Sequence, residues 1–434
     1  VNLRYRSKKI EGLSYGINVN SMYSRSATVL VMLDCDTGMY RSFPGAVTRT
    51  LMTTYNIDPF ITYFDEQGNR HSLRTRYYYL DNNNNNNQAN KSTLHYGEYQ
   101  YQKTFPGIKN FTVTSGVMGV LTNSEAPLYA ANEDSSGINT ATNLAGYMQV
   151  DKKFFERLTF NAGVRYERFR INKSVEGKPV FRSGLNFKVL RETYMRVSFG
   201  QGYRFPTIAE KYIRTGVGTM YIFLNLDIKS ETSWNAEAAI KQGLKIGNFM
   251  GYFDIAYFRQ EFENNIEFNF GYWGNTPISG PGIADSIAKN IGFRSINVGK
   301  TRVDGLDVSL MGQGKMGAIT INTLAGYTYM RPVALEPDLA YSVVDSAILL
   351  TGVVDSPSLT YNSTSSDTKG NILKYRFQHI FKADVEATYN KFSLGGSVRF
   401  NSFMQNVDKI FLVLDTGTTQ LLPTGLTQYR LDRY

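Results

Sequence analysis

Residues whose side chains could carry out catalysis or bind metal are few in this chain. The sequence has one cysteine, Cys35, and three histidines, His71, His95 and His379. A zinc site built from thiolates is therefore excluded, and the single thiol cannot form a disulfide within the chain. No nucleophile-elbow motif accompanies the histidines, so a Ser-His-Asp hydrolase has no support. We expect no enzyme activity, no catalytic residues, no metal and no cofactor.

Two short motifs superficially suggest ligand binding, and their context argues against both. The segment Val298–Thr301 (VGKT) is similar to the end of a phosphate-binding loop, but Arg294 stands where the first glycine is required. The chain also continues there as a strand, whereas such a loop opens a helix. The segment Asp34–Gly38 (DCDTG) lacks the distal glutamate of a calcium loop. We interpret it as a polar loop.

The charge balance suggests an acidic partner. The 434 residues include 47 Lys and Arg against 37 Asp and Glu, a formal charge of +10. An anionic membrane surface would suit this charge. Nucleic-acid binders concentrate their basic residues in a patch, helix or tail, whereas here they are scattered, so we expect no nucleic acid. Apolar stretches such as Ala27–Leu33 are far shorter than the roughly 20 residues of a spanning helix.

The elements that must position any site are strands with two unlike faces. Between Leu158 and Glu167, Phe160 and Val164 fall on one face, whereas Arg165 and Glu167 fall on the other. The same alternation recurs in Leu13–Asn20, Thr232–Lys241 (with Trp234), Ile319–Tyr329 and Phe381–Tyr389 (with Val385). Strands of about ten residues with aromatic ends suit a tilted bilayer span. Because backbone groups in lipid must be paired, we predict an all-β, transmembrane, antiparallel up-and-down barrel.

Short and mostly longer connections alternate along the chain, as in outer-membrane barrels. The short ones are Lys8–Gly12, Asp65–Asn69, Phe105–Asn110, Lys152–Arg157, Val189–Thr193, Gly243–Asn248, Met311–Gly317 and Asn390–Phe392. The longer ones are Asp34–Arg49, Asp81–Lys91, Thr122–Thr140, Asn172–Lys178, Tyr203–Ser230, Asn269–Gly292 and Arg331–Lys374. Eight tight turns predict about sixteen strands. We interpret the asparagine run Asn82–Asn87 as a solvated loop tip.

Three segments, in order, resemble signature motifs of the TonB-dependent outer-membrane receptors. Gly202–Tyr212 (GYRFPTIAEKY) resembles that family's G-[FY]-R-x-P-[ST]-x-x-E-x-[YF] segment. Asn225–Ser233 is similar to its N-L-x-x-E-x-S strand start, with one extra residue. Asn297–Val308 is similar to its N-x-G-x-A-x-x-x-G-L-E-[LV] strand, with Thr301 for Ala and Asp307 for Glu. The style of the loops resembles receptors of the Bacteroidetes type.

The resemblance implies a larger protein, with parts that these 434 residues do not include. It implies a barrel of about 22 strands that encloses a plug. It also implies a TonB box before the plug and active uptake of a scarce nutrient, such as an iron chelate, cobalamin, glycan or peptide. We expect residues 1–434 to be a partial barrel domain without plug, TonB box and terminal strands. The expected location is the bacterial outer membrane, and the expected partners are its lipid, TonB, the plug and, in some systems, a surface lipoprotein.

Two sets of residues are candidates for the functional site. We predict that charged residues on the polar strand faces line the lumen and hold the plug: Arg165, Glu167, Arg196, Glu231, Glu237, Lys241, Asp384, Glu386 and Arg399. Four loop aromatics could stack on a sugar or chelate ring, although girdle or loop packing explains them as well: Tyr203, Tyr212, Tyr272 and Trp273.

Two rival functions remain open at this point. A passive sixteen-stranded porin would require the visible strands to close on themselves. A receptor-like barrel that serves as a scaffold subunit of an outer-membrane complex would show no uptake defect when TonB is removed. The sequence alone does not separate these hypotheses from active uptake.

Overall fold

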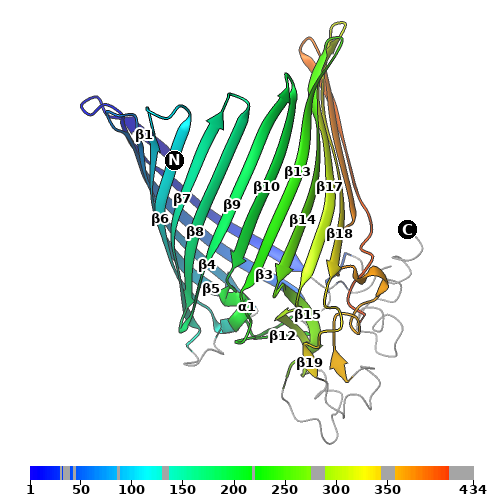
Figure 1. The fold of residues 1–434 in the computed structure, drawn as a ribbon. Helices are drawn as coiled ribbons and strands as arrows, with labels where there is room; N and C mark the ends of the chain where they lie inside the picture. Colours follow the sequence, from blue (N-terminus) through cyan, green and yellow to red (C-terminus); the bar gives the residue numbers. More distant parts are fainter. Residues whose placement is uncertain are drawn as a thin grey trace, which may run out of the picture.

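The computed structural model describes residues 1–29, 32, 40–42, 45–85, 88–129, 136–217, 220–274, 289–343 and 357–409. The polar loop at 34–38 lies outside the described residues. No helix in the described ranges is long and apolar enough to cross a membrane. Sixteen strands form one antiparallel sheet in which each strand pairs with its neighbours in chain order (Figure 1). The prediction of about sixteen up-and-down strands is confirmed.

The bounds of these strands follow the predicted pattern of segments and turns. In sheet order they are β1 (Asn2–Arg6), β2 (Leu13–Val29), β3 (Val47–Phe64), β4 (Arg70–Asn84), β5 (Asn90–Thr104), β6 (Phe111–Glu125), β7 (Ile138–Phe154), β8 (Leu158–Ile171), β9 (Ser174–Leu190), β10 (Thr193–Arg204), β13 (Glu231–Ile246), β14 (Phe249–Glu263), β17 (Thr301–Met316), β18 (Ile319–Ala334), β21 (His379–Tyr389) and β22 (Phe392–Asn401).

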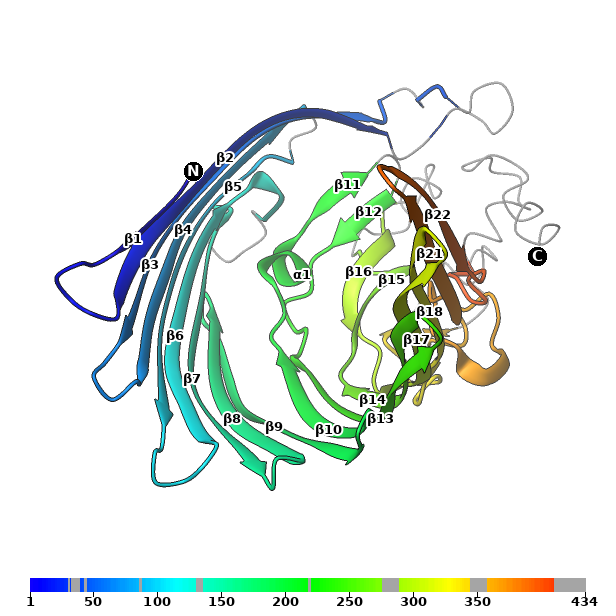
Figure 2. The ribbon, with the colours of Figure 1, turned by 90° about the horizontal axis from the view of Figure 1, so that it is seen from above.

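Smaller elements gather at the long-loop end of the sheet (Figure 1). They include a four-stranded sheet in the order β11 (Thr215–Val217), β12 (Met220–Phe223), β16 (Ile291–Asn297) and β15 (Ile266–Tyr272). Two short strands, β19 (Ser342–Val343) and β20 (Ser358–Leu359), pair with each other. The described residues also form three short helices: η1 (Pro127–Tyr129), α1 (Ile208–Tyr212) and η2 (Lys369–Asn371). Figure 2 shows α1 inside the curve of the large sheet.

The two faces of the large sheet separate apolar from charged residues. The cross-strand register carries Phe160, Val164, Trp234 and Val385 to one face and Arg165 and Glu167 to the other. The apolar face is convex, and Val164 and Val385 are 36 % and 46 % exposed on it. Large apolar side chains exposed over a whole face indicate contact with lipid, not a water-soluble core. The period of two thus assigns the two faces correctly in the five segments in which the alternation was described.

The connections confirm one part of the prediction and correct another. Each of the eight predicted short segments overlaps a hairpin turn, and these turns lie at one end of the sheet. Several of the turns are shorter than predicted, because β7 extends to Phe154, β13 to Ile246 and β17 to Met316. The expected longer connection at Asn172–Lys178 is wrong, because β8 and β9 join through Asn172 and Lys173 alone. Cross-strand pairing continues from Ile171 opposite Ser174 to Glu167 opposite Lys178. The asparagine run is also partly strand, since β4 extends to Asn84.

The sixteen-stranded sheet curves but remains open (Figure 2). In the described part of the chain, β1 pairs only with β2, and β22 pairs only with β21. The porin hypothesis requires these two edges to meet. The arrangement therefore does not provide the closed sixteen-stranded cylinder that a passive pore needs.

A pair of turn glycines allows a controlled test of the short-turn end. Gly12 and Gly68 have φ angles of +78° and +77°, but an added Cβ at Gly12 would lie 2.2 Å from the carbonyl oxygen of Phe64. At Gly68 the same atom would meet nothing within 4 Å. We expect Gly68→Ala to cost about 1 kcal/mol for its backbone angle, and Gly12→Ala about 1–3 kcal/mol more. The stability of both variants is measured by the temperature at which the folded barrel loses its heat-modifiable gel mobility. An equal loss of stability in the two variants would contradict the steric argument.

Candidate functional site

The concave face of the sheet carries all nine charged residues predicted to face the lumen. The register connects Arg165 through β9 to Arg196, and Arg196 through β13 and the following strands to Asp384 and Arg399. The same chain of pairings places Glu167, Glu231, Glu237, Lys241 and Glu386 on this face. Their position on the inner wall agrees with the prediction. The contact with a plug remains a prediction.

Several of these charges are paired, either across neighbouring strands or within one strand. The Arg196 Nε atom lies 2.7 Å from a carboxylate oxygen of Glu237, and its Nη1 atom lies 3.4 Å from Asp254. Arg165 pairs with Glu167 on its own strand. The Lys241 ammonium lies 3.5 Å from the centre of the Tyr252 ring. Such pairs hold the polar groups in fixed positions on a half-exposed wall, where each contributes little to stability by itself.

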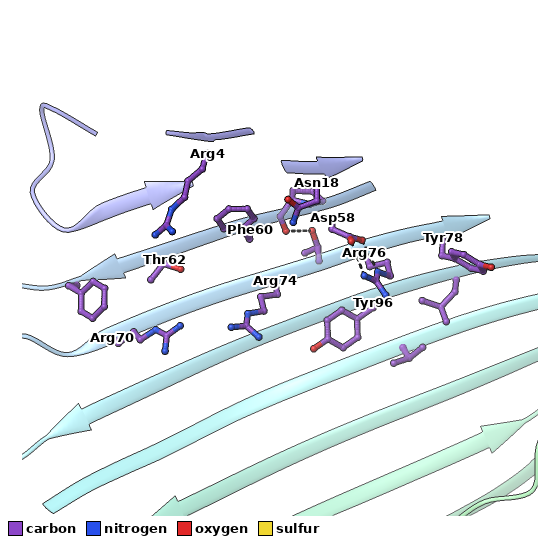
Figure 3. Close-up of a pocket in the computed structure, with 15 residues that line it drawn as sticks. Arg4, Asn18, Asp58, Phe60, Thr62, Arg70, Arg74, Arg76, Tyr78 and Tyr96 are labelled. Atoms are coloured by element: carbon purple, nitrogen blue, oxygen red, sulfur yellow. Dashed lines mark hydrogen bonds and ion pairs between the residues drawn. The ribbon is translucent and has the colours of Figure 1, made fainter. Parts of the chain in front are cut away.

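A basic basin on β1–β4 is a part of the wall that the sequence reasoning missed. Arg4, Arg70, Arg74 and Arg76 line a cavity of about 940 Å³ (Figure 3). Arg76 is neutralised by Asp58, at 2.7 Å. The Nε atom of Arg70 is buried, and the described residues provide no hydrogen-bond partner for it. An anionic group would satisfy that donor and the excess charge of the basin. The β4 arginines are separated by even numbers of residues, which places them on one face of the strand, and this spacing could have predicted the basin.

The first signature motif forms a rigid corner where β10 meets α1. The Arg204 Nη1 atom donates to both carboxylate oxygens of Glu210, at 2.7 and 3.0 Å, and its Nη2 atom lies 3.6 Å from Glu231. Thr207 caps α1, because its Oγ1 atom accepts from the Glu210 N–H at 3.2 Å. The Glu210 carboxylate in turn accepts from the Thr207 N–H at 2.7 Å. This capping box and the arginine fork fix a helix that is too short to be stable alone.

The corner is seated on a small apolar cluster at the long-loop end of the wall. Phe205 stacks on Phe169 with ring centres 5.7 Å apart and a 5° angle between the planes. Ala126, Ile171, Tyr129 and Tyr212 are the other buried members of the cluster. Because one signature segment supplies Phe205, the capping residues and Tyr212, the motif is explained as a structural unit.

The second and third signature motifs are bonded to each other. The Asn225 side chain donates to the carbonyl oxygen of Ser295 at 2.8 Å and accepts from Arg294 at 2.9 Å. The Asn297 side chain accepts from the Lys229 N–H at 2.9 Å and donates to the Lys229 carbonyl at 3.1 Å. These reciprocal bonds tie the chain before β13 to the chain before β17. The three motifs therefore organise the long-loop end of adjacent strands.

Two of the four predicted loop aromatics are already engaged within the protein. Tyr212 is 9 % exposed and belongs to the apolar cluster. The Tyr203 hydroxyl lies 3.1 Å from a carboxylate oxygen of Glu176 and 3.3 Å from the Ser230 hydroxyl. Packing explains both residues. A role in cargo binding stays a prediction for them.

The other two aromatics lie beside a cation in the loop sheet. The Trp273 ring stacks on Tyr341 at 5.9 Å, and the Arg294 guanidinium lies 5.3 Å from its centre. The indole Nε1–H is buried without a hydrogen-bond partner among the described residues. Tyr272 precedes it at the end of β15, and its carbonyl accepts from the Ser342 hydroxyl at 2.9 Å. This pair is the better candidate for contact with a planar ligand.

A buried polar cluster stabilises the loops beyond β18. No local sequence pattern predicted this cluster. The Lys374 ammonium lies 2.6 Å from Asp408, with side chains 2 % and 1 % exposed. The Tyr375 hydroxyl donates to the other oxygen of Asp408, at 2.6 Å. Burial lowers the pKa of Lys374, although Asp408 opposes the shift. Burial also raises the pKa of Glu267, whose carboxylate pairs with Arg376 at 2.9 Å.

The described residues contain no group of three His, Cys, Asp or Glu side chains placed to hold a metal ion. The cluster around Lys374 instead consists of one ion pair and hydroxyl groups. Its position among the loops, away from the concave wall, indicates a structural contribution.

The capping box makes the stability of the corner depend on pH. Burial alone would raise the pKa of Glu210, but the Thr207 N–H and the Arg204 guanidinium outweigh it and lower the pKa below 4.5. A carboxylate with a lowered pKa contributes stability that is complete above its unfolded value. The contribution should begin to fall below pH 4.5 and be lost through the folded-state pKa. Hydrogen-exchange protection factors of α1 should show this loss, whereas Glu210→Gln should give a flat profile there.

Comparison with known proteins gives one consistent result. A family model described as TonB dependent receptor-like, beta-barrel, matches residues 2–430. No curated protein matches the chain. Among solved structures, the ferric enterobactin receptor PfeA mutant of Pseudomonas aeruginosa, in complex with enterobactin, has a TM-score of 0.62 at 13 % identity over 92 % of this chain.

Two further structures show the same fold, with similar TM-scores and similarly low sequence identity. The hemophore receptor HasR of Serratia marcescens, in complex with its hemophore HasA and heme, has a TM-score of 0.58 at 14 % identity over 91 % of this chain. The siderophore receptor PirA of Acinetobacter baumannii has a TM-score of 0.58 at 14 % identity over 96 %. This chain spans 56 %, 63 % and 60 % of the PfeA, HasR and PirA chains, respectively.

Proposed function

Because this chain belongs to the TonB-dependent receptor-like β-barrel family of the Gram-negative outer membrane, we propose that it forms the wall of an energised nutrient receptor. The observation that carries the proposal is the charged concave face opposite a lipid-facing convex one. A wall that holds a movable plug needs fixed charged groups on its inner face, and pairs such as Arg196–Glu237 provide them. In this proposal residues 1–434 act with a plug domain and with TonB.

The long loops and the corner at α1 receive the cargo, and the concave wall supports its passage. We propose Tyr272 and Trp273 as contacts for a planar or aromatic cargo, with Tyr203 and Tyr212 in supporting positions. The nine wall charges would contact the plug. The basin of Arg4, Arg70 and Arg74 would neutralise carboxylates on the plug or on an anionic cargo.

Among cargo classes, an iron chelate comes first in this proposal, ahead of cobalamin, a glycan or a peptide. Among the similar structures, PfeA is in complex with enterobactin, and HasR is in complex with its hemophore and heme. An anionic chelate also suits the basic basin. The protein would act as a transporter and not as an enzyme, and a surface lipoprotein could cover the loops.

The test is growth on a candidate nutrient with and without TonB. Active uptake predicts that deletion of TonB abolishes growth at limiting cargo, while binding of labelled cargo to cells persists. Trp273→Ala should weaken that binding about tenfold, and Tyr40→Ala, at a 90 % exposed ring, serves as the control. Unchanged growth without TonB would refute active uptake and favour the scaffold hypothesis.

A further inference from the structure

The outward side chains of β8 change character in order along the strand. From the short-turn end they are Leu158, Phe160, Ala162, Val164, Tyr166, Arg168 and Arg170. Four apolar residues are followed by a tyrosine and then by two exposed arginines. A strand that crosses from hydrocarbon through the interface to charged headgroups should show this order. We infer that Arg168 and Arg170 bind the phosphate of an anionic lipid in the leaflet next to the long loops.

The charge of this patch is not balanced on its own face. The strands β7, β8 and β9 contain three carboxylates, Asp151, Glu167 and Glu176, and the register places all three on the concave face. Among the described residues, neither Arg168 nor Arg170 forms an ion pair. Two exposed guanidinium groups on the convex face therefore remain available to an external anion, as far as the described residues extend.

The neighbours of the two arginines provide room and a further donor. Arg168 lies opposite Leu144 of β7 and Gly177 of β9 in the register, so β9 places no side chain of its own next to it. The Tyr166 hydroxyl occupies this space, because a Cβ added at Gly177 would lie 2.7 Å from it. One Arg170 N–H donates to the carbonyl oxygen of Asn172 at 2.7 Å, which fixes the side chain toward the hairpin end.

A cavity at the tip of the same hairpin completes the patch. It measures about 890 Å³ and is lined by Arg170, Lys173, Thr140 and Thr142 of the hairpins and also by Lys211, Tyr212 and Leu226 at the corner of α1, so it extends over the end of the wall from the convex side. The threonines lie on the convex face, since Thr142 pairs with Arg170 across the strands. Phosphate oxygens accept from guanidinium, ammonium and hydroxyl groups alike, so the lining suits a phosphate head.

A lipid fits this patch better than a free anion does. Directly below the arginines, the exposed apolar side chains of Leu144, Val164 and Phe181 continue the same convex surface. An amphiphile can place its phosphate on the guanidinium fork and its acyl chains along this strip. A soluble phosphate would use only the first of these contacts, so we commit to a phosphorylated lipid.

The experiment uses the full-length protein purified from outer membranes and reconstituted in nanodiscs. Native mass spectrometry counts the retained molecules of lipid A carrying its phosphates and of the same lipid after dephosphorylation. We expect the wild type to retain the phosphorylated form and R168Q/R170Q to retain it at least about tenfold less. The control R157Q/R191Q removes two exposed arginines from turns at the opposite end and should behave as wild type.

Three outcomes would overturn the assignment. They are equal retention by R168Q/R170Q and wild type, equal retention of both forms of the lipid, and displacement by inorganic phosphate at the concentration of the lipid. Heat-modifiable gel mobility checks that the variant is folded. R168K/R170K keeps the charge but loses the planar fork, so partial retention by this variant is the supporting result if R168Q/R170Q does not assemble.

Discussion

The Asp408→Ala variant is expected to lose order in the loops beyond β18 while its barrel wall stays folded. Lys374 would keep its buried position without the carboxylate that lies 2.6 Å from its ammonium group. Removal of one partner from a buried ion pair costs about 3–5 kcal/mol, because the remaining charge is left without water or a counter-charge. The Tyr375 hydroxyl would lose its acceptor as well.

Hydrogen exchange resolved by segment measures this effect. We expect protection to fall by a factor of about 100 or more in residues 358–376 and to stay unchanged in β13 and β14. The control replaces both partners with apolar residues of similar size, Lys374→Met with Asp408→Leu, and should recover most of the protection. Full protection in Asp408→Ala alone would show that the pair does not hold the loops together.

The second large effect is expected from Arg204→Ala at the corner of the first signature motif. The variant removes the fork that binds Glu210 and leaves Glu231 without its neighbouring cation. Both carboxylates are mostly buried, with side chains 21 % and 12 % exposed, whereas Arg204 is 41 % exposed. Discounting for that exposure, we expect the corner to lose about 2 kcal/mol.

Unfolding of the corner should also reduce cargo uptake, because α1 lies inside the curve of the sheet at the loop end (Figure 2). We expect α1 amides to exchange about thirtyfold faster and cargo uptake to fall about tenfold. Arg204→Lys should recover part of the effect, since a lysine supplies charge without the two-pronged geometry. Arg191→Ala, at a 94 % exposed side chain, is the control. Normal uptake by Arg204→Ala would show that the corner is not needed for cargo uptake.

The two variants act on different parts of the long-loop end. Asp408 belongs to the cluster beyond β18, whereas Arg204 belongs to the corner after β10. The strand β15 lies between them, because the Glu231 carboxylate accepts from the Ile266 N–H at 2.9 Å and Glu267 pairs with Arg376 at 2.9 Å. Their effects on hydrogen exchange should therefore add outside β15 and interact within it. A double variant that loses much more protection than the sum would indicate that the loops fold as one unit.

The sequence by itself determined the strands, their inner and outer faces and the family. Alternation is a local property, so Phe160 and Arg165 could be assigned to opposite faces without knowledge of any partner strand. The eight tight turns are equally local, since glycine, asparagine and proline act within four residues. The three signature motifs were recognisable because each is a contiguous segment. Their structural role was not visible, because the Lys229–Asn297 bond joins the second motif to the third and the Asn225–Ser295 bond joins the second motif to β16.

Only the tertiary structure decided features that depend on distant residues. The pairing with β8 keeps Gly177 and Pro179 in a strand, although these residue types suggest a loop. Lys374 and Asp408 are 34 positions apart and meet only through the fold of the loops. The strands β1 and β4 are separated by β2 and β3, and the curvature of the sheet places their arginine side chains around one cavity. Burial and ion pairing are set by three-dimensional proximity, which a local pattern of side chains does not encode.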